Sequence, residues 1–83
     1  MDKETFEFIQ RSSYRQRVLK ALDEDVLMPT EIAERSNIKT NHVSKVLSEL
    51  KSKELIELIN PEARKGRLYR LTDVGEEIVE KLE

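Results

Sequence analysis

Polar side chains recur along one short segment of the chain, residues 41–48. Asn41, Ser44, Lys45 and Ser48 recur at spacings of three and four residues, which place them on one face of a helix. An asparagine amide can pair with the edge of adenine, a lysine can donate to guanine, and a serine hydroxyl can bond to a base edge or a phosphate. Such a face is either an ordinary solvated surface or a surface that can contact nucleic acid, and the elements around it decide between the two.

The sequence contains few residues of the kinds that catalysis needs. The chain has one histidine, two glycines and no cysteine, which leaves no nucleophile constellation, no set of metal ligands and no glycine-rich loop for a phosphate. We therefore expect no enzyme activity, no cofactor and no metal. The single histidine, His42, falls on the flank of the polar face, where it is either an ordinary surface residue or a contact to a phosphate or base.

A helix must present the polar face, and its opposite face is apolar. The apolar positions follow the i, i+3, i+4, i+7 spacing of an amphipathic helix: Val43, Val46, Leu47 and Leu50. Thr40 is the expected N-cap of this helix. A shorter helix is predicted just before it, capped by Thr30 and running through Arg35. Asn37 suits the left-handed backbone of the tight turn between them.

Two further helices are predicted towards the N-terminus. Residues 3–10 form a short helix, and Ser13 begins a second one with Gln16 at the capping-box position. The apolar residues 26–28 are expected to add one rung to a small sheet. A basic cluster in this half of the chain is expected to pair mostly with nearby acids: Arg11, Arg15, Arg17 and Lys20.

After Lys53 the hydrophobic period changes from that of a helix to that of strands. The segments "ELIELIN" and "RLYRLT" are β-prone and are separated by "PEARKG", which predicts a hairpin with a basic tip. In the second strand, Tyr69 and Leu71 should share one face. Thr72 then caps a last helix over residues 73–82.

Two quoted segments carry a resemblance to a known family. "PTEIAERSNIKTNHVSKVLSELKSKELI" and "RKGRLYRLTDVGEEI", the second with the pattern R-x-Y-x-L-T-x-x-G, resemble the winged helix-turn-helix domain of small MarR- and ArsR-like regulators of bacteria and archaea. The resemblance covers residues 13–82. It implies an α+β, mainly α fold, with a three-helix core, a small antiparallel β-hairpin wing and extra N- and C-terminal helices.

The same resemblance implies one domain over residues 1–83 and its parts. These are an N-terminal extension (1–12), a helix-turn-helix (30–53), a wing hairpin (54–71) and a C-terminal helix (72–83). One departure is the residue pair after the recognition helix, where many relatives have glycine and this chain has Lys53 and Glu54. A non-glycine residue in a left-handed helix end costs about 1 kcal/mol.

The resemblance also implies which residues bind. The recognition helix enters the major groove, and the basic wing tip lies along the backbone or in the minor groove. The residues expected to contact DNA are Thr30, Lys39, Thr40, Asn41, His42, Ser44, Lys45, Ser48, Arg64, Lys65 and Arg67. Terminal helices of such proteins commonly form a dimer interface. The residues expected there are Phe6, Phe8, Ile9, Ile78, Val79 and Leu82. The alternative is that these residues close the chain's own core.

The charge distribution supports this interpretation although the net charge is −2. Residues 35–70 contain nine basic and four acidic residues, so the acidic excess lies in the rest of the chain. We expect a cytoplasmic, homodimeric transcriptional regulator that binds double-stranded DNA at an inverted repeat. No apolar run is long enough for a membrane span, and "MDKETFEF" does not resemble a signal peptide.

Two other functions stay open. A winged helix can serve as a protein-binding module in a larger assembly, and the overall acidity fits that function. A general DNA-coating protein would bind tightly without sequence preference, but it would need to neutralise many phosphates, which a negative net charge opposes.

Overall fold

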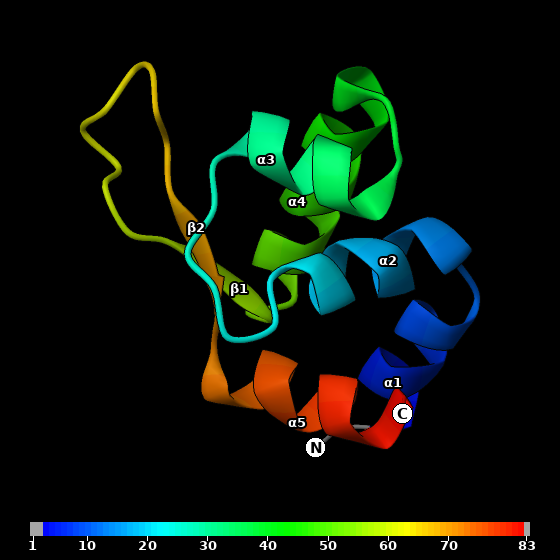
Figure 1. Ribbon diagram of the computed structural model, residues 1–83. Helices are drawn as coiled ribbons and strands as arrows, with labels where there is room; N and C mark the ends of the chain where they lie inside the picture. Colours follow the sequence, from blue (N-terminus) through cyan, green and yellow to red (C-terminus); the bar gives the residue numbers. More distant parts are fainter. Residues whose placement is uncertain (1–2, 83) are drawn as a thin grey trace.

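A computed structural model describes residues 3–82, so the outermost positions of the predicted N-terminal extension and C-terminal helix, residues 1–2 and 83, lie outside the described part. The helices and strands follow one another along the chain (Figure 1) as α1 (Lys3–Gln10), α2 (Ser13–Ala21), α3 (Pro29–Ser36), α4 (Thr40–Ser52), β1 (Ile56–Leu58), β2 (Tyr69–Leu71) and α5 (Asp73–Leu82).

Three helices, α2, α3 and α4, pack against one another and form the centre of the core. The predicted apolar face of α4 is buried, with Val43 and Leu50 fully inaccessible to solvent. From α3, Ile32 is equally buried and Ala33 lies beside it in the same cluster. The predicted α+β, mainly helical winged-helix architecture is therefore confirmed.

The hairpin attaches to this core along one face. β1 and β2 pair antiparallel, with Ile56 opposite Leu71 and Leu58 opposite Tyr69. Tyr69 and Leu71 are buried and the intervening Arg70 is exposed, as the alternation predicts. The predicted additional rung is present at Leu27, whose N–H and C=O bond to the C=O and N–H of Tyr69 at 3.0 and 2.9 Å.

The helices α2 and α4 begin one residue earlier than predicted. Ser12, not Ser13, is the N-cap of α2, and its hydroxyl accepts a hydrogen bond from the backbone N–H of Arg15 at 3.3 Å. Lys39, not Thr40, is the N-cap of α4. An N-cap residue has an extended backbone. Ser12 and Lys39 have this conformation, whereas Ser13 and Thr40 are already helical.

The start of α3 is also earlier than predicted. Its N-cap is Met28 and not Thr30, because Pro29 occupies the first helical position, where its fixed φ suits the helix and its missing N–H costs nothing. The Glu31 carboxylate accepts from the Met28 N–H at 2.9 Å, which satisfies one donor at this end. Thr30 is left as an exposed residue of the first turn.

Two helices end in left-handed residues. Asn37, at φ 57°, ends α3 and turns the chain into α4, as predicted. Glu54, at φ 59°, ends α4 with the bonds of a Schellman motif: the Glu54 N–H donates to Lys51 O and the Leu55 N–H to Leu50 O, both at 3.0 Å. The exit from α4 thus keeps the geometry that favours glycine, with glutamate in that place.

The L-T-x-x-G part of the sequence pattern joins the hairpin to α5. The Thr72 hydroxyl donates to Glu54 O at 2.7 Å and accepts from the Gly75 N–H at 3.2 Å, which confirms Thr72 as the cap of α5. The Thr72 N–H donates to Leu55 O at 3.0 Å. A Cβ on Gly75 would lie 2.1 Å from that same Leu55 oxygen, so only glycine allows α5 to approach so closely.

Candidate nucleic-acid interface

The polar face of α4 is fully available to solvent. Asn41, Ser44, Lys45 and Ser48 are all exposed, while the opposite side of the helix is buried in the core. The remaining sequence-predicted contact residues of the helix-turn-helix are exposed as well, namely Thr30, Lys39, Thr40 and His42.

The wing loop is ordered by one asparagine that the sequence analysis did not single out. The Asn60 side chain accepts from the Leu68 N–H at 2.8 Å and donates to Gly66 O at 3.1 Å, so it spans the loop from one strand to the other. Gly66 has φ +67°, a turn conformation that suits glycine. Asparagine side chains often form hydrogen bonds with nearby backbone groups, so an asparagine just before a proline at the end of a strand could have indicated this role.

Basic side chains project from this ordered loop. Arg64, Lys65 and Arg67 are all exposed, as expected for a wing tip. The Arg67 Nε donates to the carbonyl of Ala63 at 3.0 Å. That partner is neutral, so the bond orients the guanidinium without cancelling its charge. The loop stands out from the strands as the yellow segment of Figure 1.

The flank of α4 carries an ion pair beside its polar face. Arg15 of α2 binds the Glu49 carboxylate with both edges of its fork, Nε to Oε1 at 3.2 Å and Nη2 to Oε2 at 3.0 Å. These hydrogen bonds lower the pKa of the Glu49 carboxyl, partial burial opposes the effect, and the charges of Arg15 and then Lys45 lower it further. The expectation that the first basic cluster pairs with acids is thus confirmed for Arg15.

Arg17, from the same cluster, behaves differently. It donates to the backbone carbonyl of Asn37 at 2.9 Å, at the turn between α3 and α4, and lies 5.5 Å from the ring centre of Tyr14. The expectation of an acidic partner was wrong for Arg17. The carbonyls at the end of α3 carry partial negative charge, which accounts for the choice of partner.

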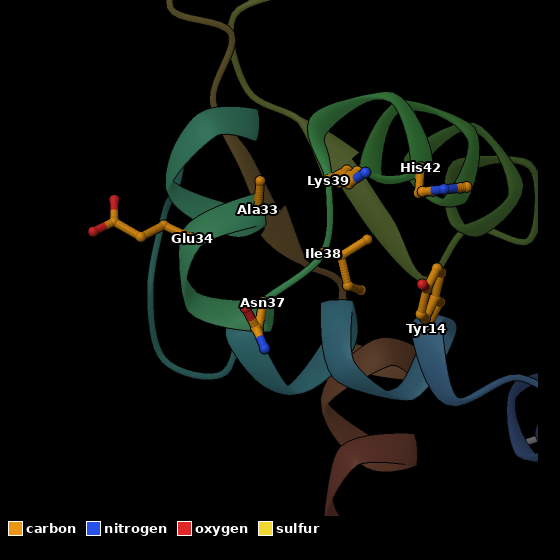
Figure 2. A pocket seen from close by; sticks show the side chains of 7 residues that line it. All are labelled: Tyr14, Ala33, Glu34, Asn37, Ile38, Lys39 and His42. Carbon is orange, nitrogen blue, oxygen red and sulfur yellow. The ribbon is translucent and has the colours of Figure 1, made fainter.

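An open hollow lies between α2 and the turn (Figure 2). The rings of Tyr14 and His42 lie next to each other at its rim, with centres 5.5 Å apart in an edge-to-face arrangement. The Glu34 side chain points away from them. His42 therefore packs on an aromatic ring at the flank of the α4 polar face. Tyr14 was not recognised from the sequence as a neighbour of this face, because the two residues are far apart along the chain.

The predicted dimer interface is only partly at the surface. Ile9, Ile78 and Val79 are 0, 0 and 2% exposed within one chain, so they close the chain's own core and offer no surface to a partner. Phe6 and Leu82 are half-buried at its edge. Phe8 already stacks with the guanidinium of Arg15, whose carbon lies 3.6 Å from the ring centre.

Residues 3–82 show two further properties. No group of three or more potential ligands among the described histidine, aspartate and glutamate residues could hold a metal ion. The helices of the described residues are all too short or too polar to cross a bilayer.

Comparison with known proteins finds this fold in DNA-binding proteins. Two solved structures are each 26% identical to the chain: Bordetella bronchiseptica BpsR, whose DNA binding is regulated by 6-hydroxynicotinic acid, with TM-score 0.78, and wild-type Lactococcus lactis ZitR in complex with DNA, with TM-score 0.74. The matches cover 86 and 83% of this chain but 55 and 48% of BpsR and ZitR. The chain therefore spans about half the length of these proteins.

A MarR family transcriptional regulator from Silicibacter pomeroyi shares the fold at 23% identity and TM-score 0.73, over 95% of this chain and 59% of that one. No curated protein matches the chain. Among protein families, the one described as Winged helix-turn-helix matches residues 10–83, which is most of the chain. With its helix-turn-helix, hairpin and closing helix in the expected order, the chain belongs to the winged helix-turn-helix family.

Proposed function

We propose that the chain is a sequence-specific, double-stranded DNA-binding transcriptional regulator, and that binding rather than catalysis is its role. The observation that carries the proposal is the exposed polar face of α4, formed by Asn41, Ser44, Lys45 and Ser48, together with an ordered basic wing. The ZitR structure in complex with DNA has the same fold at 26% identity, which supports this use of the surface.

In this proposal α4 lies in the major groove with its polar face towards the bases. A helix fits a groove about 12 Å wide, and amide, ammonium and hydroxyl groups suit the donors and acceptors on base edges. Thr30, Lys39 and Thr40 stand in the first turns of α3 and α4 or just before them, where side chains and backbone N–H groups suit phosphates. His42 is held edge-to-face against Tyr14 at the flank of the polar face, where it contacts a phosphate or a base.

The wing supplies contacts to the DNA backbone or the minor groove. Arg64, Lys65 and Arg67 project from a loop that Asn60 already holds in shape, so little ordering is needed when they meet phosphates or a narrow minor groove. The acidic remainder of the chain opposes binding to arbitrary DNA. Specific affinity should therefore depend on the placed contacts of α4.

We further propose that the chain acts as a homodimer at an inverted repeat. A core in a chain of 83 residues is thin, and the half-buried Phe6 and Leu82 provide apolar surface at its edge. Light scattering tests the dimer: Phe6→Ser should yield the monomer mass, with Ile59→Ser as the control at an exposed apolar residue elsewhere. An unchanged dimer mass for Phe6→Ser would rule out this interface.

The experiment that tests DNA recognition is selection from a random duplex library, with sequencing of the bound fraction at near-physiological salt. Enrichment of an inverted repeat with half-sites about one helical turn apart supports the dimeric regulator. Binding without enrichment would instead indicate a general DNA-coating protein. Folded protein that binds no duplex would overturn the proposal.

A protein-binding module is the second candidate function. Ile59 and Val74 are each 41% exposed, and Val74 lines a hollow together with Leu58 and Pro61. Apolar surface of this kind suits a protein partner. The library experiment separates the two candidates, because a purely protein-binding module has no affinity for duplex DNA.

A further inference from the structure

We propose that Arg15 is a positioning residue for DNA recognition: by holding the Glu49 carboxylate on the α2 side of α4, it keeps Lys45 available to the bases. This inference rests on the proposed function, because it concerns the same face of α4. Arg15 itself does not reach DNA in this account. Its effect is to decide which partner Lys45 takes.

The geometry shows that Arg15 is fully committed within the protein. Besides its two bonds to Glu49, its Nη1 donates to Phe8 O at 2.9 Å, and its guanidinium lies over the Phe8 ring at 3.6 Å. The Arg15 and Glu49 side chains are only 18 and 27% exposed. A fork–fork pair in such surroundings is geometrically specific, so the carboxylate is fixed and not merely nearby.

Glu49 is also a potential partner of Lys45. The two residues are four positions apart on α4, a spacing at which opposite charges on a helix meet. Lys45 is close enough for its charge to stabilise the ionised Glu49 carboxylate. Lys45 is exposed and belongs to the polar face, whereas Glu49 is half-buried at the flank, so Arg15 draws the carboxylate away from that face.

Removing Arg15 should leave the Glu49 carboxylate free to pair with Lys45. An unheld Glu49 carboxylate can pair with Lys45 along the helix and would also stand close to the phosphates of bound DNA, where like charges repel. Arg15→Met keeps an apolar side chain of similar length against Phe8 and removes only the fork. We expect it to weaken binding about three- to tenfold and to shift base preference towards that of Lys45→Ala.

The test measures affinity and base preference on the duplex recovered by selection, using competition with single-base variants. It compares the wild type, Lys45→Ala, Arg15→Met, Glu49→Gln and the double variant Arg15→Met/Glu49→Gln. The double variant should regain the wild-type preference, because the neutral amide no longer captures Lys45. Glu49→Gln can restore stability simply by removing the carboxylate that Arg15→Met leaves unpaired, so base preference is the readout that a purely structural role would not move.

A matched control separates this local effect from general electrostatics. Arg15→Met/Glu34→Gln has the same net charge as the rescued double variant, but it leaves Glu49 ionised. Glu34 belongs to α3, so its charge also lies on the helix-turn-helix. It is exposed and points away from the other labelled side chains in Figure 2. We expect this control to keep the altered preference of Arg15→Met. Equal rescue by Glu34→Gln and Glu49→Gln would overturn the proposal.

Thermal unfolding by circular dichroism checks that each variant is folded at the assay temperature. If Arg15→Met unfolds, Arg15→Lys replaces it, since lysine keeps the charge and stem but cannot form the fork; it should shift preference in the same direction by a smaller factor. An unaltered preference in the folded variant overturns the proposal. Wild-type protein that binds no DNA, or an unaltered preference in Lys45→Ala, overturns the proposed function itself and this inference with it.

Discussion

Glu49 couples the stability of the chain to pH. Its carboxyl pKa is lowered in the folded state, chiefly by the hydrogen bonds from Arg15, so the folded state binds this proton less tightly than the unfolded chain does. The resulting stabilisation is complete above the ordinary glutamate pKa of about 4.3 and is lost as pH falls through the lowered folded-state pKa.

Glu49→Gln removes this dependence and should therefore change the acid response of the protein. Between pH 7 and pH 3, the free energy of unfolding should fall further in the wild type than in Glu49→Gln, as measured by urea unfolding monitored by circular dichroism. Glu34→Gln is the control, since Glu34 is exposed on α3. Parallel pH profiles for the wild type and Glu49→Gln would contradict the prediction.

The Asn60 side chain bridges the wing loop and helps to fix its shape. Asn60→Ala removes both side-chain bonds across the loop and leaves the Leu68 N–H without its partner, at a cost of about 1 kcal/mol. We expect faster amide hydrogen exchange at Leu68 and weaker DNA binding with an unaltered base preference. Asn60→Asp keeps the acceptor for Leu68 and loses the donor to Gly66 O, so amide exchange at Leu68 should be intermediate.

At the scale of a helix, the end of α4 stores strain at Glu54. A residue with a Cβ at φ 59° costs about 1–2 kcal/mol, whereas glycine adopts this conformation freely but loses about 0.4–1 kcal/mol through its more flexible unfolded chain. Glu54→Gly should therefore raise the free energy of unfolding by about 0.5–1 kcal/mol. Glu54→Ala removes the charge and keeps the strain, so a gain from alanine as large as that from glycine would refute the explanation.

Glycine is already present where α5 contacts the hairpin, at Gly75, and replacing it should destabilise the fold. Alanine would gain about 1 kcal/mol of helix propensity, but its Cβ would meet a backbone oxygen, Leu55 O, at 2.1 Å and force α5 to move. Such overpacking costs about 1–3 kcal/mol or more, and the shift would also strain the bond from the Thr72 N–H. Gly75→Ala should thus lower the thermal midpoint, whereas Val74→Ala, at an exposed position of the same helix, should not.

Over the whole molecule, the sequence predicted local features better than contacts between distant segments. The turn at Asn37, the cap at Thr72 and the alternation at Tyr69 and Leu71 depend on near neighbours in the chain, and all are confirmed. Three N-caps were misplaced by one or two residues. The extended cap conformation falls at Ser12 and Lys39 in two helices, and in α3 Pro29 already occupies the first helical position after Met28.

Long-range packing accounts for the other differences. The Arg15–Glu49 pair joins positions 34 residues apart, and the burial of Ile9 follows from how α1 packs on the core. A sequence pattern marks an apolar face but does not say whether the same chain or a partner covers it. The polar residues of α4 share one exposed face, and the basic residues of the wing are exposed, as the local periodicity and the turn residues predict.

The distribution of charge over the whole molecule predicts how binding should respond to salt. Each phosphate neutralised by a basic side chain contributes about 0.9 to the slope of log affinity against log salt concentration. Lys65 is exposed at the wing tip, so Lys65→Ala should reduce this slope by about 0.9 and weaken binding equally on all sequences. Lys45→Ala should instead cost about 1–3 kcal/mol at the base it reads and alter preference.

Lys81→Ala provides the matched control for this comparison. Lys81 is exposed in the last turn of α5, outside the helix-turn-helix and the wing, yet its loss changes the net charge by the same amount. Affinities measured by fluorescence anisotropy over a salt series should give an unchanged slope for Lys81→Ala. If its slope fell as much as that of Lys65→Ala, overall charge rather than a placed wing contact would govern binding, and the assigned interface would be wrong.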